Sequence, residues 1–286
     1  MRTTVAKGGS VELFARIAGD RSDPALILLH GWPHDGSLYD PVIDRLGERF
    51  FTIAFDLPAI GRSTGAPPSA EKATLASVIL DAAASLGAER PVVAGIDVGG
   101  MIAYSAARDF AERIHGVAIG NTVIPGLDPW QKVISDPRIF HFALHAVPDL
   151  PELLVTGRER PYFDFFFDFL GSKQRPLPNT MRDAFTRAYL RPEALSAGFD
   201  WYRAFAADAR ANEQPKRLTT PILYFRGDAD GRTPEDYVAG LRRAGAEQVT
   251  SQVLAGGAEF TPIEMPDEFA SMIEDFAINC FAAVAA

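Results

Sequence analysis

Two parts of the chain alternate short apolar runs with segments in which apolar residues recur at helical spacing. The runs at 25–30, 51–56, 92–96 and 117–120 are short and continuous, as in strands buried on both faces. Between them, apolar positions from 75 to 86 and from 101 to 114 recur every three or four residues, which predicts helices. Strand-like runs return at 221–226 and 249–254, and a helix is expected from Pro266. This alternation predicts βαβ crossovers and a parallel sheet covered on both faces.

The middle of the chain breaks this pattern. Residues from about 123 to 216 are rich in aromatic residues, prolines and charges, and their apolar spacing is helical with no clear strand. We therefore expect one α/β core at 1–123 and 214–286, interrupted by a helical cap domain, or lid, at 124–213. The length of 286 residues suits such a core with one insertion.

Composition excludes several classes of protein. The chain has 28 basic and 37 acidic residues and a formal net charge of −9, which argues against binding to nucleic acid or to an anionic membrane surface. Its one cysteine, Cys280, cannot form an internal disulfide, and its place in the apolar stripe of the last helix predicts a buried core residue.

The sequence contains no signature of a targeting or spanning segment, or of a metal, nucleotide or flavin site. We expect a cytoplasmic monomer or homodimer that acts on a small hydrophobic substrate without a cofactor.

The sharpest local signal is the segment 95–100, Gly-Ile-Asp-Val-Gly-Gly, which joins a predicted strand to a predicted helix. A nucleophile elbow needs small residues around such a turn, and the carboxylate of Asp97 would be its nucleophile, forming an ester with substrate. Alternatively, Asp97 only caps the helix. A second match to the elbow pattern surrounds Ser63, but Ala66-Pro67-Pro68 follows it where a helix should begin.

The segment His30-Gly-Trp-Pro33 directly follows the first predicted strand. A turn at this point can aim the backbone N–H of Trp32 at an oxyanion, together with the N–H of Val98. The alternative is a plain turn that ends the strand.

With these segments in place, the chain resembles the α/β-hydrolase fold superfamily, in its Asp-nucleophile branch of epoxide hydrolases and dehalogenases. The resemblance covers nearly the whole chain and is carried by the segments 30–33, 56–63, 95–100 and 227–230 and by the end segment up to Pro266. It implies an eight-stranded, mostly parallel sheet with helices on both faces and a lid inserted after strand 6. Dehalogenases usually place Trp or Arg after the nucleophile, so Val98 favours an epoxide hydrolase-like enzyme.

The resemblance also assigns roles within the cap. The segment Asp200-Trp-Tyr-Arg203 looks like the lid motif whose tyrosine, here Tyr202, donates to the epoxide oxygen. His141 is the natural second donor and Tyr162 the fallback, since ring opening creates a strongly basic alkoxide. Each of them could instead serve only to pack the lid. Aromatic residues are expected to line the apolar substrate pocket, namely Trp32, Phe142, Tyr162, Phe166 and Trp201.

One position departs from the family's pattern. Asp230 matches the acid that normally orients a catalytic histidine, but the histidine position, seven residues before Pro266, holds Glu259. No histidine follows His145. If Asp97, Asp230 and Glu259 share one enclosed pocket, they cannot all stay ionised, so at least one pKa should be raised.

The glutamate leaves three hypotheses open. Glu259 could direct water at an ester on Asp97, completing an atypical Asp-Asp-Glu triad. Alternatively, the pocket performs acid/base isomerisation, cyclisation or elimination, with a protonated carboxyl group as the acid. The third hypothesis is a pseudo-hydrolase that binds a ligand without turnover.

Overall fold

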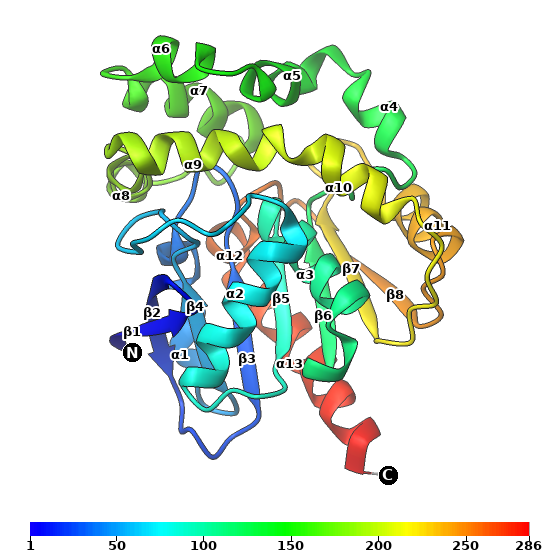
Figure 1. Ribbon diagram of the computed structural model, residues 1–286. Helices are drawn as coiled ribbons and strands as arrows, with labels where there is room; N and C mark the ends of the chain where they lie inside the picture. Colours follow the sequence, from blue (N-terminus) through cyan, green and yellow to red (C-terminus); the bar gives the residue numbers. More distant parts are fainter. Residues whose placement is uncertain (286) are drawn as a thin grey trace.

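The structure, a computed structural model, describes residues 1–285 and is built on one eight-stranded sheet (Figure 1). The strand order is β1-β2-β4-β3-β5-β6-β7-β8, and only the pairs β1–β2 and β2–β4 are antiparallel. The strands are β1 (Arg2–Gly8), β2 (Val11–Ala18), β3 (Ala25–Leu29), β4 (Phe51–Phe55), β5 (Val92–Ile96), β6 (Gly116–Gly120), β7 (Ile222–Gly227) and β8 (Val249–Leu254). This confirms the predicted fold class of a mostly parallel sheet.

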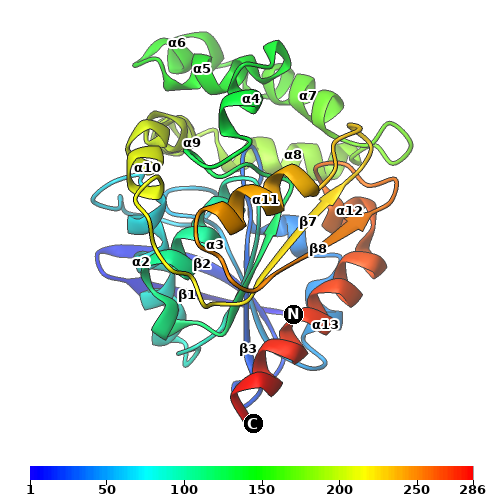
Figure 2. The ribbon, with the colours of Figure 1, turned by 90° about the vertical axis from the view of Figure 1, so that its right-hand side faces the viewer.

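Helices cover both faces of this sheet, which is why its central strands read as continuous apolar runs. The helices α2 (Lys72–Ser85) and α3 (Val98–Asp109) lie on one face, and α1 (Ile43–Leu46) and α13 (Pro266–Ala285) lie on the other (Figure 2). The helix α11 (Glu235–Arg243) packs against β8. As predicted, Cys280 is buried on the inner side of α13, and burial raises the pKa of its thiol to about 12.

A layer of helices between β6 and β7 lies across the carboxyl edge of the sheet (Figure 1). Its members are α4 (Trp130–Ile134), η3 (Pro137–Ile139), α5 (Phe140–Ala146), α6 (Leu150–Val155), α7 (Glu159–Leu170), α8 (Asn179–Ala188), α9 (Pro192–Arg203) and α10 (Phe205–Asn212). All of them fall inside the segment 124–213 that the sequence assigns to a cap, although the domain boundaries themselves stay a prediction.

Two short elements, η1 (Gly36–Tyr39) and α12 (Thr261–Glu264), follow the carboxyl ends of β3 and β8 beneath the cap. A third, η2 (Ala111–Arg113), lies at the opposite edge of the sheet, between the end of α3 and the start of β6. Within residues 1–285, no helix combines the length and the apolar character that crossing a membrane requires.

Candidate active site

Asp97 stands at the sharp turn between β5 and α3. Its backbone has φ 53° and ψ −124°, an unusual conformation for a residue other than glycine. A Cβ on Gly95 would overlap the carbonyl of Gly99, and one on Gly99 would overlap the carbonyl of Leu29, so the turn needs both glycines. The Asp97 side chain makes no capping hydrogen bond to α3, which removes the support for the simple helix-cap alternative.

The turn after β3 holds one oxygen of this carboxylate. The backbone N–H of Trp32 donates to Oδ2 of Asp97 at 2.7 Å, and any side chain on Gly31 would occupy the space of that oxygen. The ring of His30 fixes the turn, because Nδ1 lies 2.8 Å from the carbonyl oxygen of Gly31 and Nε2 lies 2.9 Å from the N–H of Leu57. Burial raises the pKa of Asp97 to about 6, although the nearby backbone N–H groups of Trp32 and Val98 favour the ionised form.

The carboxylate faces a small cavity of about 70 Å³ between the sheet edge and the cap, room for a few water molecules. Core and cap both contribute to its walls, which include apolar and polar residues. The residues that line it are Trp32, Asp97, Asn121, Thr122, Val123, Val133, Ile139, His141, Phe142, Leu170, Tyr202, Arg226, Arg232, Tyr237 and Glu259.

The cap supplies two neutral donors to this cavity, Tyr202 from α9 and His141 from α5. Burial and the charge of Asp97 raise the pKa of Tyr202 far above its ordinary value, so the phenol stays protonated. Burial lowers the pKa of His141 to about 4, so its imidazole is neutral, and its buried Nδ1 has no hydrogen-bond partner within the described residues. Both side chains can therefore serve as uncharged hydrogen-bond donors to a developing alkoxide.

Of the aromatic residues expected to bind substrate, Trp32 and Phe142 line the cavity. The other expected residues, Tyr162, Phe166 and Trp201, are not among its lining residues. The hydroxyl of Tyr162 lies 2.7 Å from Nε2 of His145, which engages this fallback donor, while Phe166 packs on the Trp32 ring at 4.9 Å. Their contact with substrate stays a prediction.

Glu259 lies in the loop between β8 and α12 and lines the same cavity as Asp97. Its Oε1 is buried and has no hydrogen-bond partner among residues 1–285. Burial and the negative charge of Asp97 raise the pKa of Glu259 well above its ordinary value, against the attraction of Arg226. The structure thus brings Asp97 and Glu259, two of the three predicted carboxyl groups, to one cavity, and Oε1 of Glu259 is available there for a new hydrogen bond.

Asn121 holds the Glu259 loop in place, a role that the sequence patterns did not indicate. It follows β6 directly with φ 49°, and its Nδ2 donates to the carbonyl oxygens of Ala258 at 2.9 Å and Glu259 at 3.1 Å. Its Oδ1 accepts from the N–H of Gly227 at 3.0 Å. The only sequence signal is an Asn directly after a strand, a residue type that tolerates positive φ.

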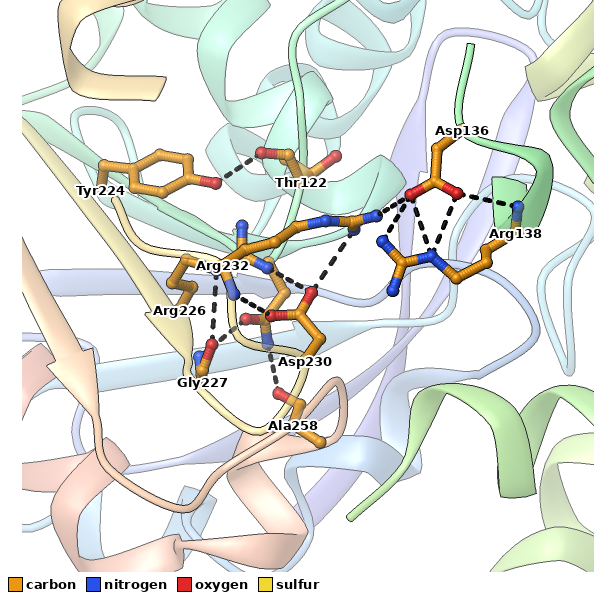
Figure 3. A network of polar contacts seen from close by, with 10 residues as sticks. Thr122, Asp136, Arg138, Tyr224, Arg226, Gly227, Asp230, Arg232 and Ala258 are labelled. Carbon is orange, nitrogen blue, oxygen red and sulfur yellow. Dashed lines mark hydrogen bonds and ion pairs between the residues drawn. The ribbon is translucent and has the colours of Figure 1, made fainter. Parts of the chain in front are cut away.

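Asp230 lies in an ion-pair network at the rim of the site (Figure 3). Its carboxylate accepts from Nη2 of Arg226 at 2.8 Å and from the N–H of Arg232 at 2.9 Å, and its side chain is 40% exposed. Asp230 does not line the cavity that holds Asp97, and no hydrogen bond joins it to Glu259 within the described chain. Its role as the acid that orients the base stays a prediction.

The described residues contain no cluster of three or more His, Cys, Asp or Glu side chains suited to a metal ion. The cavity brings together the Asp97 carboxylate, which the Trp32 N–H restrains, the Glu259 carboxyl group, and two neutral donors from the cap. This arrangement can form an ester on Asp97, protonate an alkoxide, and exchange protons with a water molecule.

Comparison with known proteins agrees with the fold. The sequence model of the family described as "alpha/beta hydrolase fold" matches residues 24–266. The chain is similar to a soluble epoxide hydrolase of Corynebacterium sp. (strain C12), with 27% identity over 267 residues that cover 90% of each chain. It is also similar to a pimeloyl-[acyl-carrier protein] methyl ester esterase of Yersinia enterocolitica, with 26% identity covering 93% of this chain and 97% of the relative.

Among solved structures, the crystal structure of wild-type Cfl2 from Burkholderia cenocepacia superimposes with a TM-score of 0.85 and 28% sequence identity. The match covers 96% of this chain and 95% of that one.

Proposed function

Because the chain belongs to the α/β-hydrolase fold family, we propose that it is an epoxide hydrolase-like enzyme that opens a hydrophobic epoxide through an ester on Asp97. One observation carries this proposal. A carboxylate occupies the elbow, one of its oxygens accepts the Trp32 N–H, and the neutral phenol of Tyr202 lines the same cavity. The similarity to a soluble epoxide hydrolase of Corynebacterium supports the same reaction class.

In the first step, the free oxygen of Asp97 attacks an epoxide carbon, and the carbon–oxygen bond of the ring breaks. The electron pair of that bond stays on the ring oxygen, which becomes an alkoxide. Tyr202 gives its proton to this alkoxide while His141 donates a hydrogen bond, and the product is a hydroxyalkyl ester of Asp97. The phenolate is reprotonated from water.

In the second step, the Glu259 carboxylate removes a proton from a water molecule, and the resulting hydroxide attacks the ester carbonyl of Asp97. The N–H of Trp32, which already donates to that carboxyl oxygen, and the N–H of Val98 stabilise the oxyanion that forms on it. Collapse of this intermediate breaks the bond to the alkoxide, which takes the proton from Glu259 and leaves as the diol. The Asp97 carboxyl group gives its own proton to the hydroxide left when Tyr202 was reprotonated, which restores the carboxylate. Asp230 supports this step indirectly, since it holds the guanidinium of Arg226, whose charge favours ionised Glu259.

Turnover of styrene oxide in ¹⁸O-labelled water tests the mechanism. Under multiple turnover we expect label in the diol and in Asp97, whereas a single turnover should place label in Asp97 alone. The variant Glu259→Gln should still form the ester but release it slowly, so that intact-mass spectrometry detects alkylated enzyme. Asp97→Asn is the control and should form no adduct, and full turnover by that variant would overturn every covalent mechanism.

A second candidate is non-hydrolytic acid/base chemistry, which the unpartnered carboxyl oxygen of Glu259 and its raised pKa favour. In that case the epoxide would rearrange to an isomer of equal mass, and no solvent oxygen would enter product or enzyme. Binding without any turnover would identify a pseudo-hydrolase. The same labelling experiment therefore separates the three hypotheses.

A further inference from the structure

A second chamber of about 330 Å³ adjoins the cavity that holds Asp97. The two spaces have several lining residues in common, which makes the outer chamber an approach to the inner one. The shared residues are Asn121, Ile139, Leu170, Arg226, Arg232 and Glu259. A ligand that reaches Asp97 through this approach and is too long for the inner cavity would have one part in each chamber.

The walls of the outer chamber carry more positive than negative charge. Core and cap together contribute Arg138, Lys173, Arg226 and Arg232, whereas the carboxyl groups on its walls are those of Asp230 and Glu259. This local excess is unusual in a chain whose formal net charge is −9. Asp136 adds one further carboxylate at the edge of the network, where it binds Arg138 and Arg232 (Figure 3).

The arginines of this chamber are held in place by other side chains. Nη2 of Arg226 donates to Asp230, and its side chain is only 6% exposed. Arg232 is fixed between Asp136 at 3.0 Å and Asp230 at 3.4 Å. Guanidinium groups oriented in this way lose little side-chain entropy when an anion binds, and their planar shape suits a carboxylate.

A lysine supplies the remaining positive charge. Lys173 is exposed and makes no hydrogen bond or ion pair within the described residues. It follows α7 in the cap and lines the chamber together with the core arginines, so a carboxylate bound there would meet cations from both the core and the cap.

We propose that the outer chamber binds a carboxylate carried by the substrate, while the apolar part of the same molecule extends into the inner cavity toward Asp97. Val123, Ile139 and Phe142 give the inner cavity apolar walls, and its volume of about 70 Å³ suits only the reacting end of such a molecule, while the rest occupies the outer chamber. The reaction at Asp97 rests on the proposed function, but recognition of the carboxylate does not. The substrate class that follows is an amphipathic acid with its epoxide some distance from its carboxyl group.

Isothermal titration with 4-phenylbutyrate and its uncharged amide tests this site without requiring turnover. We expect the acid to bind at least about tenfold more tightly than the amide at low salt, and this preference to shrink at high salt. The variants Lys173→Gln and Arg232→Gln should each reduce the preference. Lys216→Gln removes an equal charge from an exposed side chain paired with Asp109 outside the chamber and should leave it unchanged.

Equal affinities for acid and amide would overturn the proposal, as would a preference that both chamber variants retain. Because Arg232→Gln also removes two ion pairs, Lys173→Gln serves as the variant that leaves the network intact. If the wild type prefers the acid but forms no ester with 4-carboxystyrene oxide, the carboxylate site stands and the proposed hydrolysis fails.

Discussion

The backbone N–H of Trp32 donates to Oδ2 of Asp97 at a distance of 2.7 Å. This bond restrains one carboxyl oxygen and leaves the other for bonding to substrate. It also places a donor beside the oxygen on which negative charge would gather when water attacks an ester. The same N–H thus serves the resting nucleophile and the later intermediate.

The buried carboxylate of Asp97 should cost the protein stability at neutral pH. Its pKa of about 6 lies above the ordinary value of 3.8, so the folded chain binds this proton more tightly than the unfolded chain. The free energy of unfolding therefore loses this contribution as the pH rises from about 4 to about 6. The free energy of unfolding of Asp97→Asn should therefore rise relative to that of wild type across this pH interval. Above pH 6 the difference should reach at most about 3 kcal/mol.

Urea unfolding at a series of pH values measures this difference. Parallel stability curves for the two proteins across that range would contradict the expectation.

Removal of the Tyr202 hydroxyl should slow the opening of the ring. Tyr202→Phe keeps the aromatic packing of a side chain that is 2% exposed but removes the proton for the alkoxide. We expect the rate of ester formation to fall roughly 10²-fold, with a residual rate supported by His141. Rapid-quench measurement of the Asp97 adduct gives this rate, and an unchanged rate would assign proton donation to another group.

A histidine at position 259 should make the hydrolytic step faster. An imidazole with a pKa near 6.5 is a better base at neutral pH than a buried carboxyl group that holds its proton. Glu259→His should therefore release the Asp97 ester roughly tenfold faster at pH 7 than wild type does. Single-turnover release of diol measures this step, and slower release would mean that the pocket is built around the carboxylate.

The amide of Asn121 should matter for ester hydrolysis and not for ester formation. Asn121→Asp keeps the oxygen that accepts from Gly227 and tolerates the same positive φ, but it loses both donors to the Glu259 loop. We expect ester release to slow about tenfold or more while ester formation changes little. Separate timing of the two steps checks this, and equal slowing of both would indicate a general loss of structure.

The buried pair of Lys72 and Asp208 should anchor the cap to the core. Nζ of Lys72 donates to Oδ2 of Asp208 at 2.7 Å and to the carbonyl oxygen of Trp201 at 2.6 Å. Lys72→Met leaves a buried carboxylate without its cation and should lower the free energy of unfolding by about 3–5 kcal/mol.

Adding Asp208→Asn removes that uncompensated charge and should recover part of the loss. Chemical denaturation of both variants tests the pair, and a loss below about 1 kcal/mol in Lys72→Met would rule out this anchoring role.

Sequence patterns predicted the fold where burial dictates the residue types. The central parallel strands are covered on both faces and so appear as continuous apolar runs. The elbow was recognisable because its close backbone contacts require Gly95 and Gly99. The hairpin β1–β2 gave no such run, because β1 lies at the edge of the sheet and exposes several of its side chains, including Val5.

The polar contacts of the site were less predictable, because they join residues far apart in the chain. A motif placed Asp230 near the site, but its ion pairs depend on the conformation of the loop after β7, and a cap residue, Asp136, completes the network. The role of Asn121 arises only where the ends of β6 and β7 meet the Glu259 loop. No local sequence pattern predicts these contacts between distant segments of the chain.

The loop that carries Glu259 is bound to the cap as well as to the core. Its Glu259 N–H donates to the carbonyl oxygen of Leu170 at the end of α7. In α12, Glu264 accepts from the Ser172 N–H with one oxygen and from the Ala258 N–H with the other. Withdrawal of this part of the cap would break the bonds to Leu170 and Ser172, while the bonds from Asn121 to the same loop would remain. Glu259 would therefore be fully restrained only while the cap encloses the ligand, so activation of water would be timed by closure of the cap.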